Sequence, residues 1–572
     1  MKYFLRYLLL AAAITVLALF QALHIPDQYT EVKAFRGATL EGAVFDPLIA
    51  RSLNENYGVS VTMDGTRVRL YPSDIYMNVR LQPMGSLAMI RDIFSCNAHM
   101  YDGAEIWVKR GTDSVLMHPG TLEGEINGQT VALSEAPLIL NGNIFLPIKD
   151  IAAIFGFSCT INSEGANRQI ALSSEAATPL SLPAAFDLRD EGRVAPTMNQ
   201  GTESTCWAHA STGAMESALR PEDIAFFDIE DMIAKKGYSF KGKTGGDYSQ
   251  ALAYLLSWKG PVTLGTSEPV KDYHLSEVRF FTADDIDAIK LAIYKNGGVT
   301  SSIYSDTAST GTMVSSPYYN ALKNAYCYTG TEEPNHDIVI IGWDDERPAS
   351  DFGGKARGKG AFICQNSWGE DFGDNGVFYV SYYDSNIGSQ AVSYSRIMSS
   401  EGYDIIHQSD LCGWTGQIGY SGENVFAANI FTAGVDEDVS ACGFYALGKD
   451  TIYEVYIVED FQGVEDLSKR KPVASGRLEN KGYYTISFDS PVFVSAGERF
   501  AVMLSITTPG VSQPMAVEYT SERMEGEADI SDGEGYISVN GLDWTSVEEK
   551  SHGNLCLKAY SNIKERSEGS ED

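Results

Sequence analysis

The sequence predicts a multidomain protein, with a small α+β region near the N-terminus, a larger α+β region in the middle and an all-β region at the C-terminal end. The chain has 572 residues. Because single hydrophobic cores stop growing near about 250–300 residues, a chain of this length should form about three or four domains. A repeated pattern marks the first region. Beyond Glu401 the helical periodicity fades into short alternating strands separated by turn residues, which marks the last.

Composition and charge exclude several classes of partner. Apolar residues make up 44% of the chain and charged residues 21%, which is typical of globular protein. The formal net charge of −33 repels phosphate backbones, so we expect no nucleic-acid partner. The eight cysteines are widely spaced and form no CxxC pair, which disfavours finger-type zinc sites and a dense disulfide framework. One or two disulfides remain open outside the cytoplasm. We expect no metal ion and no cofactor.

The first 25 residues are typical of a signal sequence. Lys2 and Arg6 precede an apolar run from Tyr7 to Phe20. Positive residues stay inside, so the rest of the chain should lie outside the cytoplasm. The apolar run is intermediate in length between a cleaved signal and a spanning helix, and bulky Phe20 stands where a cleavage site needs a small residue. We therefore favour an uncleaved anchor at residues 1–25, which predicts a protein attached to the membrane at the cell surface; secretion after cleavage is the alternative.

The first folded region, residues 58–175, follows a connector at 26–57 and contains two similar copies. Each copy combines short strands with a short helical stretch, such as Ile148 to Phe155, which is followed by Gly156. The cysteines of the two copies occupy equivalent positions, so they either pair or are two separate small core residues; we favour separate residues. The repeated elements are Asp64-Gly65 with Asn127-Gly128, and Phe94-Ser95-Cys96 with Phe157-Ser158-Cys159.

One segment of this region, Leu138 to Gly156, resembles the stalk-type repeats named after the N-terminal domain of copper amine oxidases. The resemblance implies a small α+β module that holds other domains away from a cell surface. It supplies no copper ligands, because His99 and His118 are lone histidines that we expect in the core or at the surface. A linker rich in Ser, Ala and Pro follows at residues 176–182.

A cysteine at a predicted helix start is the first sign of chemistry. Cys206 follows a turn of glycine and small polar residues and begins a helix-compatible run that extends to Leu219. The helix macrodipole favours thiolate over thiol at this position. Because thiolate is the reactive form, Cys206 is a candidate nucleophile.

Three further residues suit the same chemistry. His336 precedes the apolar strand Ile338 to Trp343, so a rigid strand would hold it as the base. Asn366 follows the strand Ala361 to Ile363 and can accept a hydrogen bond from one imidazole nitrogen, which orients the other toward sulfur. The amide of Gln200, with the Cys206 backbone N–H, can form an oxyanion hole, in which each donor typically contributes about 10²–10³ in rate.

With these motifs the chain resembles the papain family of cysteine peptidases over residues 183–398. The resemblance implies a two-lobed α+β catalytic domain whose mature N-terminus matches Pro183 to Arg189. It implies that Gln200, Cys206, His336 and Asn366 hydrolyse peptide bonds through a thioester. Trp368 matches the indole that shields the histidine–asparagine pair. The residues expected to contact a peptide or protein substrate are Gly245, Gly246, Asn335, Asp337 and Trp368.

Several positions depart from the family pattern. Glu203, Ser204 and Thr205 replace Cys, Gly and Ser, so the usual local disulfide cannot form. His209 replaces an aromatic residue, and we expect it to pack or lie at the surface rather than act as a base. Asp337 replaces a small residue that, in the family, lines the pocket for the second side chain before the scissile bond. The hypothesis is that its carboxylate admits a basic residue there; an aspartate turned to solvent is the alternative.

The C-terminal region, residues 399–562, should form an antiparallel β sandwich before a disordered tail at 563–572. It resembles the lectin-like β domain that follows papain-like domains in some bacterial proteins. The resemblance implies binding of a sugar such as a cell-wall glycan, and a purely structural role remains equally open. The segments that carry the resemblance are Gly413-Trp414, Ala427 to Ala433, Gly443 to Tyr445, Tyr453 to Tyr456 and Asn554 to Ala559. The runs predicted as strands are Thr451 to Val458, Gly482 to Phe488 and Phe500 to Ile506.

The favoured hypothesis is an extracytoplasmic cysteine peptidase projected from a bacterial-type surface on a stalk. One alternative is an inactive papain-like scaffold that binds peptides or cell-wall glycans. Another is a surface transpeptidase or acyl transferase on the same fold, which would reveal itself by amine capture of the acyl-enzyme. The intact Cys, His and Asn set favours activity, while Glu203-Ser204-Thr205 keeps the scaffold alternative open.

Overall fold

The computed structural model describes residues 58–564, apart from residues 73, 79, 141, 165–166, 242–244, 265–272, 307–315, 400–401 and 523. The described chain forms a smaller unit that ends at Ser181 and a larger unit from Leu182 onward, which also includes Arg69–Pro72. The predicted anchor at 1–25, the connector at 26–57 and residues 565–572 of the predicted tail lie outside the described residues. Within the described ranges, no helix is both long enough and apolar enough to span a bilayer.

The smaller unit repeats a strand–helix–strand pattern, as its sequence predicts. Strand β4 (Pro83–Ser86) leads into helix α3 (Leu87–Phe94), and strand β11 (Asn143–Pro147) leads into helix α4 (Ile148–Ile154). Strands β4 and β11 pair antiparallel in one sheet, so the two copies share hydrogen bonds. The other strands are β1 (Val59–Met63), β2 (Thr66–Arg67), β3 (Ile75–Met77), β5 (Asn97–Tyr101), β6 (Glu105–Arg110), β7 (Asp113–Met117), β8 (Glu123–Ile126), β9 (Gln129–Ala132), β10 (Leu138–Leu140), β12 (Ser158–Glu164) and β13 (Asn167–Ser173).

The cysteines carry no cross-link. Cys96 is fully buried and Cys159 is partly buried, and both are free thiols. All eight cysteines of the chain are free in the structure. Cys96 and Cys159 are therefore separate residues, which was the favoured alternative.

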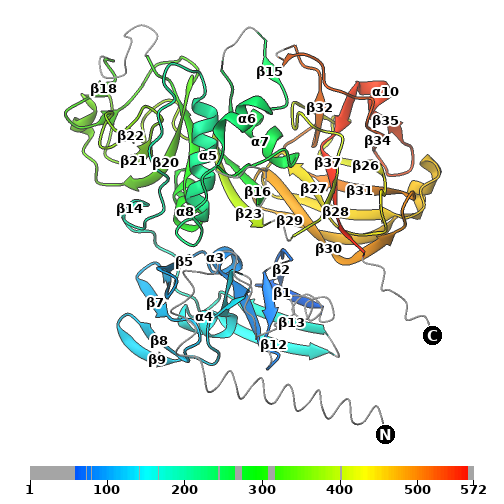
Figure 1. Ribbon diagram of the computed structural model, residues 1–572, viewed down its shortest axis with the longest axis horizontal. Helices are drawn as coiled ribbons and strands as arrows, with labels where there is room; N and C mark the ends of the chain where they lie inside the picture. Colours follow the sequence, from blue (N-terminus) through cyan, green and yellow to red (C-terminus); the bar gives the residue numbers. More distant parts are fainter. Residues whose placement is uncertain are drawn as a thin grey trace. The chain divides into compact units, whose positions relative to one another are not determined.

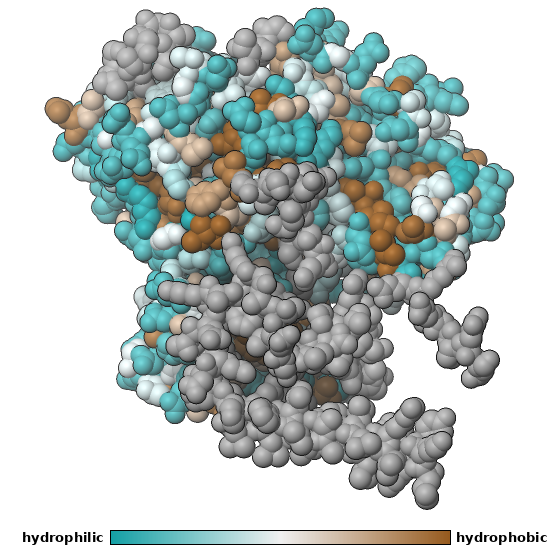
Figure 2. All heavy atoms as spheres, viewed as in Figure 1, coloured by the Kyte–Doolittle hydropathy of each residue, from teal (hydrophilic) through white to brown (hydrophobic). Residues whose placement is uncertain are grey.

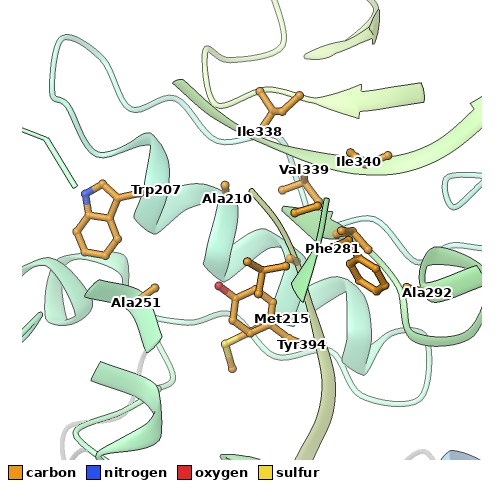
Figure 3. Packing of buried hydrophobic residues seen from close by; sticks show 14 of the residues in the cluster. Trp207, Ala210, Met215, Ala251, Phe281, Ala292, Ile338, Val339, Ile340 and Tyr394 are labelled. Carbon is orange, nitrogen blue, oxygen red and sulfur yellow. The ribbon is translucent and has the colours of Figure 1, made fainter. Parts of the chain in front are cut away.

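A helix packed against a strand forms the centre of the larger unit. Helix α5 (Cys206–Leu219) contacts strand β20 (His336–Asp344), and Figure 3 shows Ala210 of the helix near Val339 of the strand. The approach is close at Gly298, where a Cβ atom would lie 2.6 Å from Val339 Cγ1. Interiors are packed near crystal density, so a larger residue there would push the strand from the helix. The other helices are α6 (Ile229–Ala234), α7 (Tyr248–Leu256), α8 (Ile286–Asn296) and α10 (Val547–Ser551), with 3-10 turns η4 (Ala349–Phe352) and η5 (Val464–Lys469).

One continuous sheet runs through the middle and C-terminal regions (Figure 1). Its strand order is β18-β19-β22-β21-β20-β17-β23-β16-β30-β27-β37-β24, and β14 also pairs with β20. The junction is the antiparallel pair of β16 and β30, which crosses the predicted boundary between residues 398 and 399. The bounds are β14 (Ala185–Asp187), β16 (Tyr273–Phe281), β17 (Val299–Ile303), β18 (Tyr319–Asn320), β19 (Ala325–Tyr326), β21 (Ala361–Gln365), β22 (Val377–Ser381), β23 (Ala391–Ser399), β24 (Ile405–His407), β27 (Glu437–Ala446), β30 (Gly482–Val494) and β37 (Leu557–Ile563).

A second sheet completes the predicted C-terminal sandwich. Its order is β29-β28-β31-β26-β34-β35, and apolar residues such as Val455, Phe500 and Leu557 are buried together in one core. The three runs predicted as strands correspond to β28, β30 and β31. The remaining bounds are β15 (Ser239–Phe240), β25 (Gly416–Ile418), β26 (Asn424–Thr432), β28 (Thr451–Val458), β29 (Lys471–Leu478), β31 (Arg499–Thr507), β32 (Met515–Tyr519), β33 (Met524–Glu525), β34 (Gly535–Ser538), β35 (Thr545–Ser546) and β36 (Gly553–Leu555).

A short upstream segment is built into the sheet junction of the larger unit. Tyr71 is buried, and its hydroxyl donates a hydrogen bond of 2.8 Å to the carboxylate of Glu277 on β16. Arg69 forms an ion pair with the same carboxylate, which is 1% exposed. Arg279 also contacts it, so this buried charge is compensated by two guanidinium groups. On the face shown in Figure 2, polar residues predominate among the coloured atoms, in keeping with the high net charge.

The sheet junction can be tested at Gly482, the first residue of β30. A Cβ atom there would lie 2.1 Å from the backbone oxygen of Val278 on β16. We predict that Gly482→Ala forces the two strands apart and destabilises the larger unit by about 1–3 kcal/mol, the usual cost of overpacking. The measurement is the midpoint of thermal unfolding. Gly434→Ala is the matched control, because a Cβ atom there meets no atom within 4 Å; equal midpoints for the two variants would contradict the prediction.

Candidate active site

The candidate nucleophile lies at the first residue of the central helix. Helix α5 begins at Cys206, and the N–H of Ala208 donates back to the carbonyl of Thr205 at 3.0 Å. The Cys206 side chain is buried, and its sulfur accepts backbone N–H groups of Asp337, Trp207 and Cys206 itself. These donors, together with the positive end of the helix dipole, stabilise negative charge on sulfur.

The candidate base, His336, is the first residue of β20. The next residue, Asp337, donates its backbone N–H to the sulfur of Cys206. His336 Nε2 donates a hydrogen bond of 2.8 Å to Asn366 Oδ1. Asn366 directly follows β21, which pairs antiparallel with β20, and its own N–H donates to the Gly376 carbonyl at 2.9 Å. Trp368 stacks on the imidazole with ring centroids 4.6 Å apart. With Nε2 engaged, Nδ1 is the imidazole nitrogen left to exchange a proton with sulfur.

Burial opposes a lone charge on either group. It raises the pKa of Cys206 to about 12, with a further rise from the nearby Asp337 carboxylate. Burial also lowers the pKa of His336 to about 4, against the opposing hydrogen bond of Asn366. Charge therefore arises best by proton transfer from sulfur to imidazole, which creates both charges together and leaves the pair neutral overall.

Gln200 is fixed by the loop that carries Asn366. Its backbone N–H donates to the Ser367 carbonyl at 2.8 Å, and its Oε1 accepts from Ser367 Oγ at 2.6 Å. Nε2 donates one hydrogen to the Glu203 carbonyl at 2.6 Å. An amide nitrogen carries two hydrogens, so one N–H remains for an oxyanion.

The predicted substrate residues lie around this centre. A Cβ atom on Gly245 would lie 3.5 Å from Ser204 Cβ, so the glycine pair adjoins the nucleophile loop. Gly246 leaves no room for a side chain, since a Cβ atom would lie 2.6 Å from Trp207 Nε1. Asn335 is exposed; its Nδ2 donates to the carbonyl of Ser305, just beyond the end of β17, and its Oδ1 accepts the N–H of Ser305.

Asp337 is half-buried beside the nucleophile, and its Oδ1 accepts a hydrogen bond of 2.5 Å from Ser302 Oγ. Sequence reasoning missed Ser302, because it lies opposite Asp337 only through the register of β17 and β20. His209 is tied to its own helix by a contact of 3.0 Å between Nδ1 and the Thr205 carbonyl. That contact favours the packing role that we expected for His209.

Sequence reasoning also missed Glu216 of α5 as a residue that lines the candidate site. Its Oε1 accepts the N–H of Phe227 at 2.9 Å, and burial raises its pKa to about 7. A mainly apolar crevice of about 130 Å³ lies between these elements, and His209, Glu216, Asp337 and Asn366 are among its lining residues. The available signal in the sequence was spacing: Glu216 follows His209 by seven residues, which places the two on one face of the helix.

Within the described ranges, no group of three or more His, Cys, Asp or Glu side chains is arranged to hold a metal ion.

Three family models match separate regions of the chain. Residues 182–395 match the model of the papain family cysteine proteases. Residues 406–561 match a lectin-like domain, and residues 100–172 match the copper amine oxidase N-terminal domain. Each match falls in the region where the motifs predict it.

Curated relatives match the papain-like region. The chain is 27% identical over 225 residues to the probable cysteine protease RD19B of Arabidopsis thaliana, covering 35% of this chain and 58% of that protein. It is 26% identical over 224 residues to cathepsin S of Mus musculus, covering 36% of this chain and 61% of that protein. The chain thus spans less than two thirds of the length of these relatives.

A solved structure resembles the larger unit as a whole. The cysteine protease and lectin-like domains of Cwp84, a surface layer associated protein of Clostridium difficile, are 21% identical with a TM-score of 0.57. The match covers 68% of this chain and 90% of that structure, and it establishes the fold. A second Cwp84 structure, solved after propeptide cleavage, is 22% identical with a TM-score of 0.57 and covers 66% of this chain and 99% of that one. The chain therefore joins a region similar to papain family cysteine proteases to a lectin-like region, as its motifs predict.

Proposed function

We propose that this chain is an extracytoplasmic cysteine peptidase that hydrolyses peptide bonds at Cys206. The observation that carries the proposal is the hydrogen bond of 2.8 Å between His336 and Asn366, made at the strand end that also bonds the sulfur of Cys206. The match of residues 182–395 to papain family cysteine proteases supports the same reaction class.

The first half of the reaction forms a thioester. The thiol proton passes to His336, and the sulfur of Cys206 attacks the peptide carbonyl. The second N–H of Gln200 and the N–H of Cys206 hold the resulting oxyanion. His336 then gives its proton to the leaving amine as the C–N bond breaks, so the acyl group stays on sulfur.

The second half releases the acyl group as an acid. Water attacks the thioester carbonyl while His336 accepts one of its protons. The C–S bond breaks, the acid leaves, and the proton returns to sulfur. Asn366 holds the ring in place through both halves, and Trp368 covers its hydrogen bond to His336.

Backbone groups near the nucleophile are the proposed binding site for an extended substrate. Gly245 and Gly246 adjoin Ser204 and Trp207, and the lack of side chains lets a peptide backbone approach them. Asn335 and Asp337 flank His336 and complete the proposed site.

A cell-surface location is part of the proposal. The basic and apolar N-terminal run supports export, and the Cwp84 relative in fold is named as a surface layer associated protein. Only the lectin-like match supports binding of a cell-wall glycan by the C-terminal region. We therefore place glycan binding second to a structural role in the shared sheet.

A thiol-selective peptide epoxide tests the nucleophile. We predict one adduct per chain, on Cys206, with loss of the adduct in His336→Ala, because proton transfer to imidazole makes the thiolate. The measurement is peptide mapping by mass spectrometry.

The matched control is Cys412→Ala, which removes another partly exposed thiol and should leave labelling unchanged. Labelling without peptide hydrolysis, but with transfer of the acyl group to an added amine, would identify an acyl transferase. Absence of an adduct on Cys206 would support a binding scaffold instead.

The oxyanion role of Gln200 can be separated from its structural role. We predict that Gln200→Ala lowers kcat for a peptide substrate by about 10²–10³, the usual effect of one lost oxyanion donor. Alkylation of Cys206 by iodoacetamide should stay near the wild-type rate, because that reaction forms no oxyanion. Glu203→Ala is the control, since Gln200 bonds only its backbone carbonyl. An equal loss in kcat and alkylation would show instead that the loop has collapsed.

A further inference from the structure

An acidic residue adjoins the proposed catalytic pair. Asp337 follows His336 on β20, and its backbone N–H donates to the sulfur of Cys206. Val339, two residues on, packs against α5, and alternate residues of a strand share a face. The Asp337 carboxylate therefore lies on the face of β20 that meets the helix of the nucleophile.

Among the described residues, no lysine or arginine forms an ion pair with this carboxylate. Its only hydrogen bond within the described residues is the one from Ser302 Oγ, and no ion pair to it occurs there. A second carboxylate, Asp247, raises its energy further when both are charged. The titratable or polar groups near it are Cys206 on α5, Ser302 on β17, Asp247 and Tyr248 at the start of α7, and Tyr394 on β23, and His209 and Glu216 of α5 line the same crevice.

The carboxylate acts against the nucleophile. Burial, and then Asp247, raise the pKa of Asp337 to about 7. Above that pH the side chain is negative, and its charge raises the pKa of the Cys206 thiol. A negative charge beside the nucleophile hinders thiolate formation unless a positive charge joins the site.

A substrate side chain can supply that positive charge. Asp337 is only partly buried, so a solute can reach it. Asp247 directly follows Gly246, which belongs to the proposed backbone-binding pair, so both carboxylates lie where a bound peptide would run. Asp247 is itself held by capping α7, since its Oδ1 accepts the N–H of Ser249 at 2.8 Å. It is therefore a fixed second charge, and Asp337 is the freer acceptor.

We propose that a basic side chain of the substrate pairs with Asp337 and thereby removes its repulsion of the Cys206 thiolate, so that a cationic substrate activates the nucleophile that cleaves it. The substrate part of this proposal rests on the proposed peptidase function. The coupling between Asp337 and the thiol does not, because it can be measured without a peptide.

The coupling is tested by iodoacetamide alkylation of Cys206 between pH 5 and 8.5, in wild type and in Asp337→Asn. Asparagine keeps the acceptor oxygen for Ser302 but cannot ionise. At pH 5 the two rates should agree, because Asp337 is then protonated. Above pH 7 the variant should react faster, by about threefold for each pKa unit of thiol shift, since tenfold more thiolate is partly offset by its lower nucleophilicity. Equal rates throughout, or a slower variant, would overturn the proposal.

The effect of a cation is tested with butylguanidinium, using uncharged butylurea as its matched control. Butylguanidinium should accelerate alkylation of wild type above pH 7, and butylurea should not. Neither should accelerate Asp337→Asn, whereas Asp247→Asn should retain the effect of the cation. Should Asp337→Asn fail to fold, as judged by circular dichroism, Asp337→Ser serves as the second variant. An equal response of wild type and variant would refute the pairing with Asp337.

Peptides that differ only in one side chain, arginine or leucine, then test the substrate. In wild type above pH 7 the arginine peptide should show the higher kcat as well as the lower KM, and both advantages should vanish in Asp337→Asn. An advantage in KM alone would overturn activation. If butylguanidinium accelerates alkylation but no peptide is hydrolysed, the peptidase function is refuted and the coupling between Asp337 and the thiol still holds. The failure of the proposed function is therefore distinguishable from the failure of this proposal.

Discussion

The close packing of helix α5 against strand β20 is the constraint on which the site depends. Cys206, the proposed nucleophile, begins the helix and His336, the proposed base, begins the strand, although 130 positions separate them in the sequence. Their chemistry works only if both elements are held at one distance and one angle. Gly298 permits this distance, because any side chain there would meet Val339. Buried apolar residues on both elements then fix the approach without any covalent link (Figure 3).

Sequence reasoning predicted the elements that carry the candidate site because those elements are encoded locally. The helix start at Cys206, the strand start at His336 and the turn around Asn366 each follow from a few neighbouring residues. The predicted strands of the C-terminal region were found for the same reason. The roles of these residues and the residue boundaries of the domains remain predictions.

Features set by long-range pairing could not be predicted. The register that places Ser302 opposite Asp337 leaves no mark in either local sequence. The pairing of β16 with β30 is equally hidden, since strands so far apart meet only in the folded sheet. The bond from Gln200 to Glu203 depends on the local fold of a loop whose sequence departs from the family pattern.

The shared sheet changes how the C-terminal region should be understood. A module joined by a linker moves independently, whereas strands of one sheet move together because each shares hydrogen bonds with its neighbour. Glu277 lies on the junction strand itself, and its pairing with Arg69, Arg279 and Tyr71 adds polar contacts where the two regions meet. The candidate site and the sandwich are thus parts of one structural body.

The state of the cysteines has a practical consequence. With all eight thiols free, none of the fold's stability comes from an oxidised cross-link. A reductant strong enough to regenerate an oxidised nucleophile would therefore leave the scaffold intact. Storage in reducing buffer therefore carries no structural penalty.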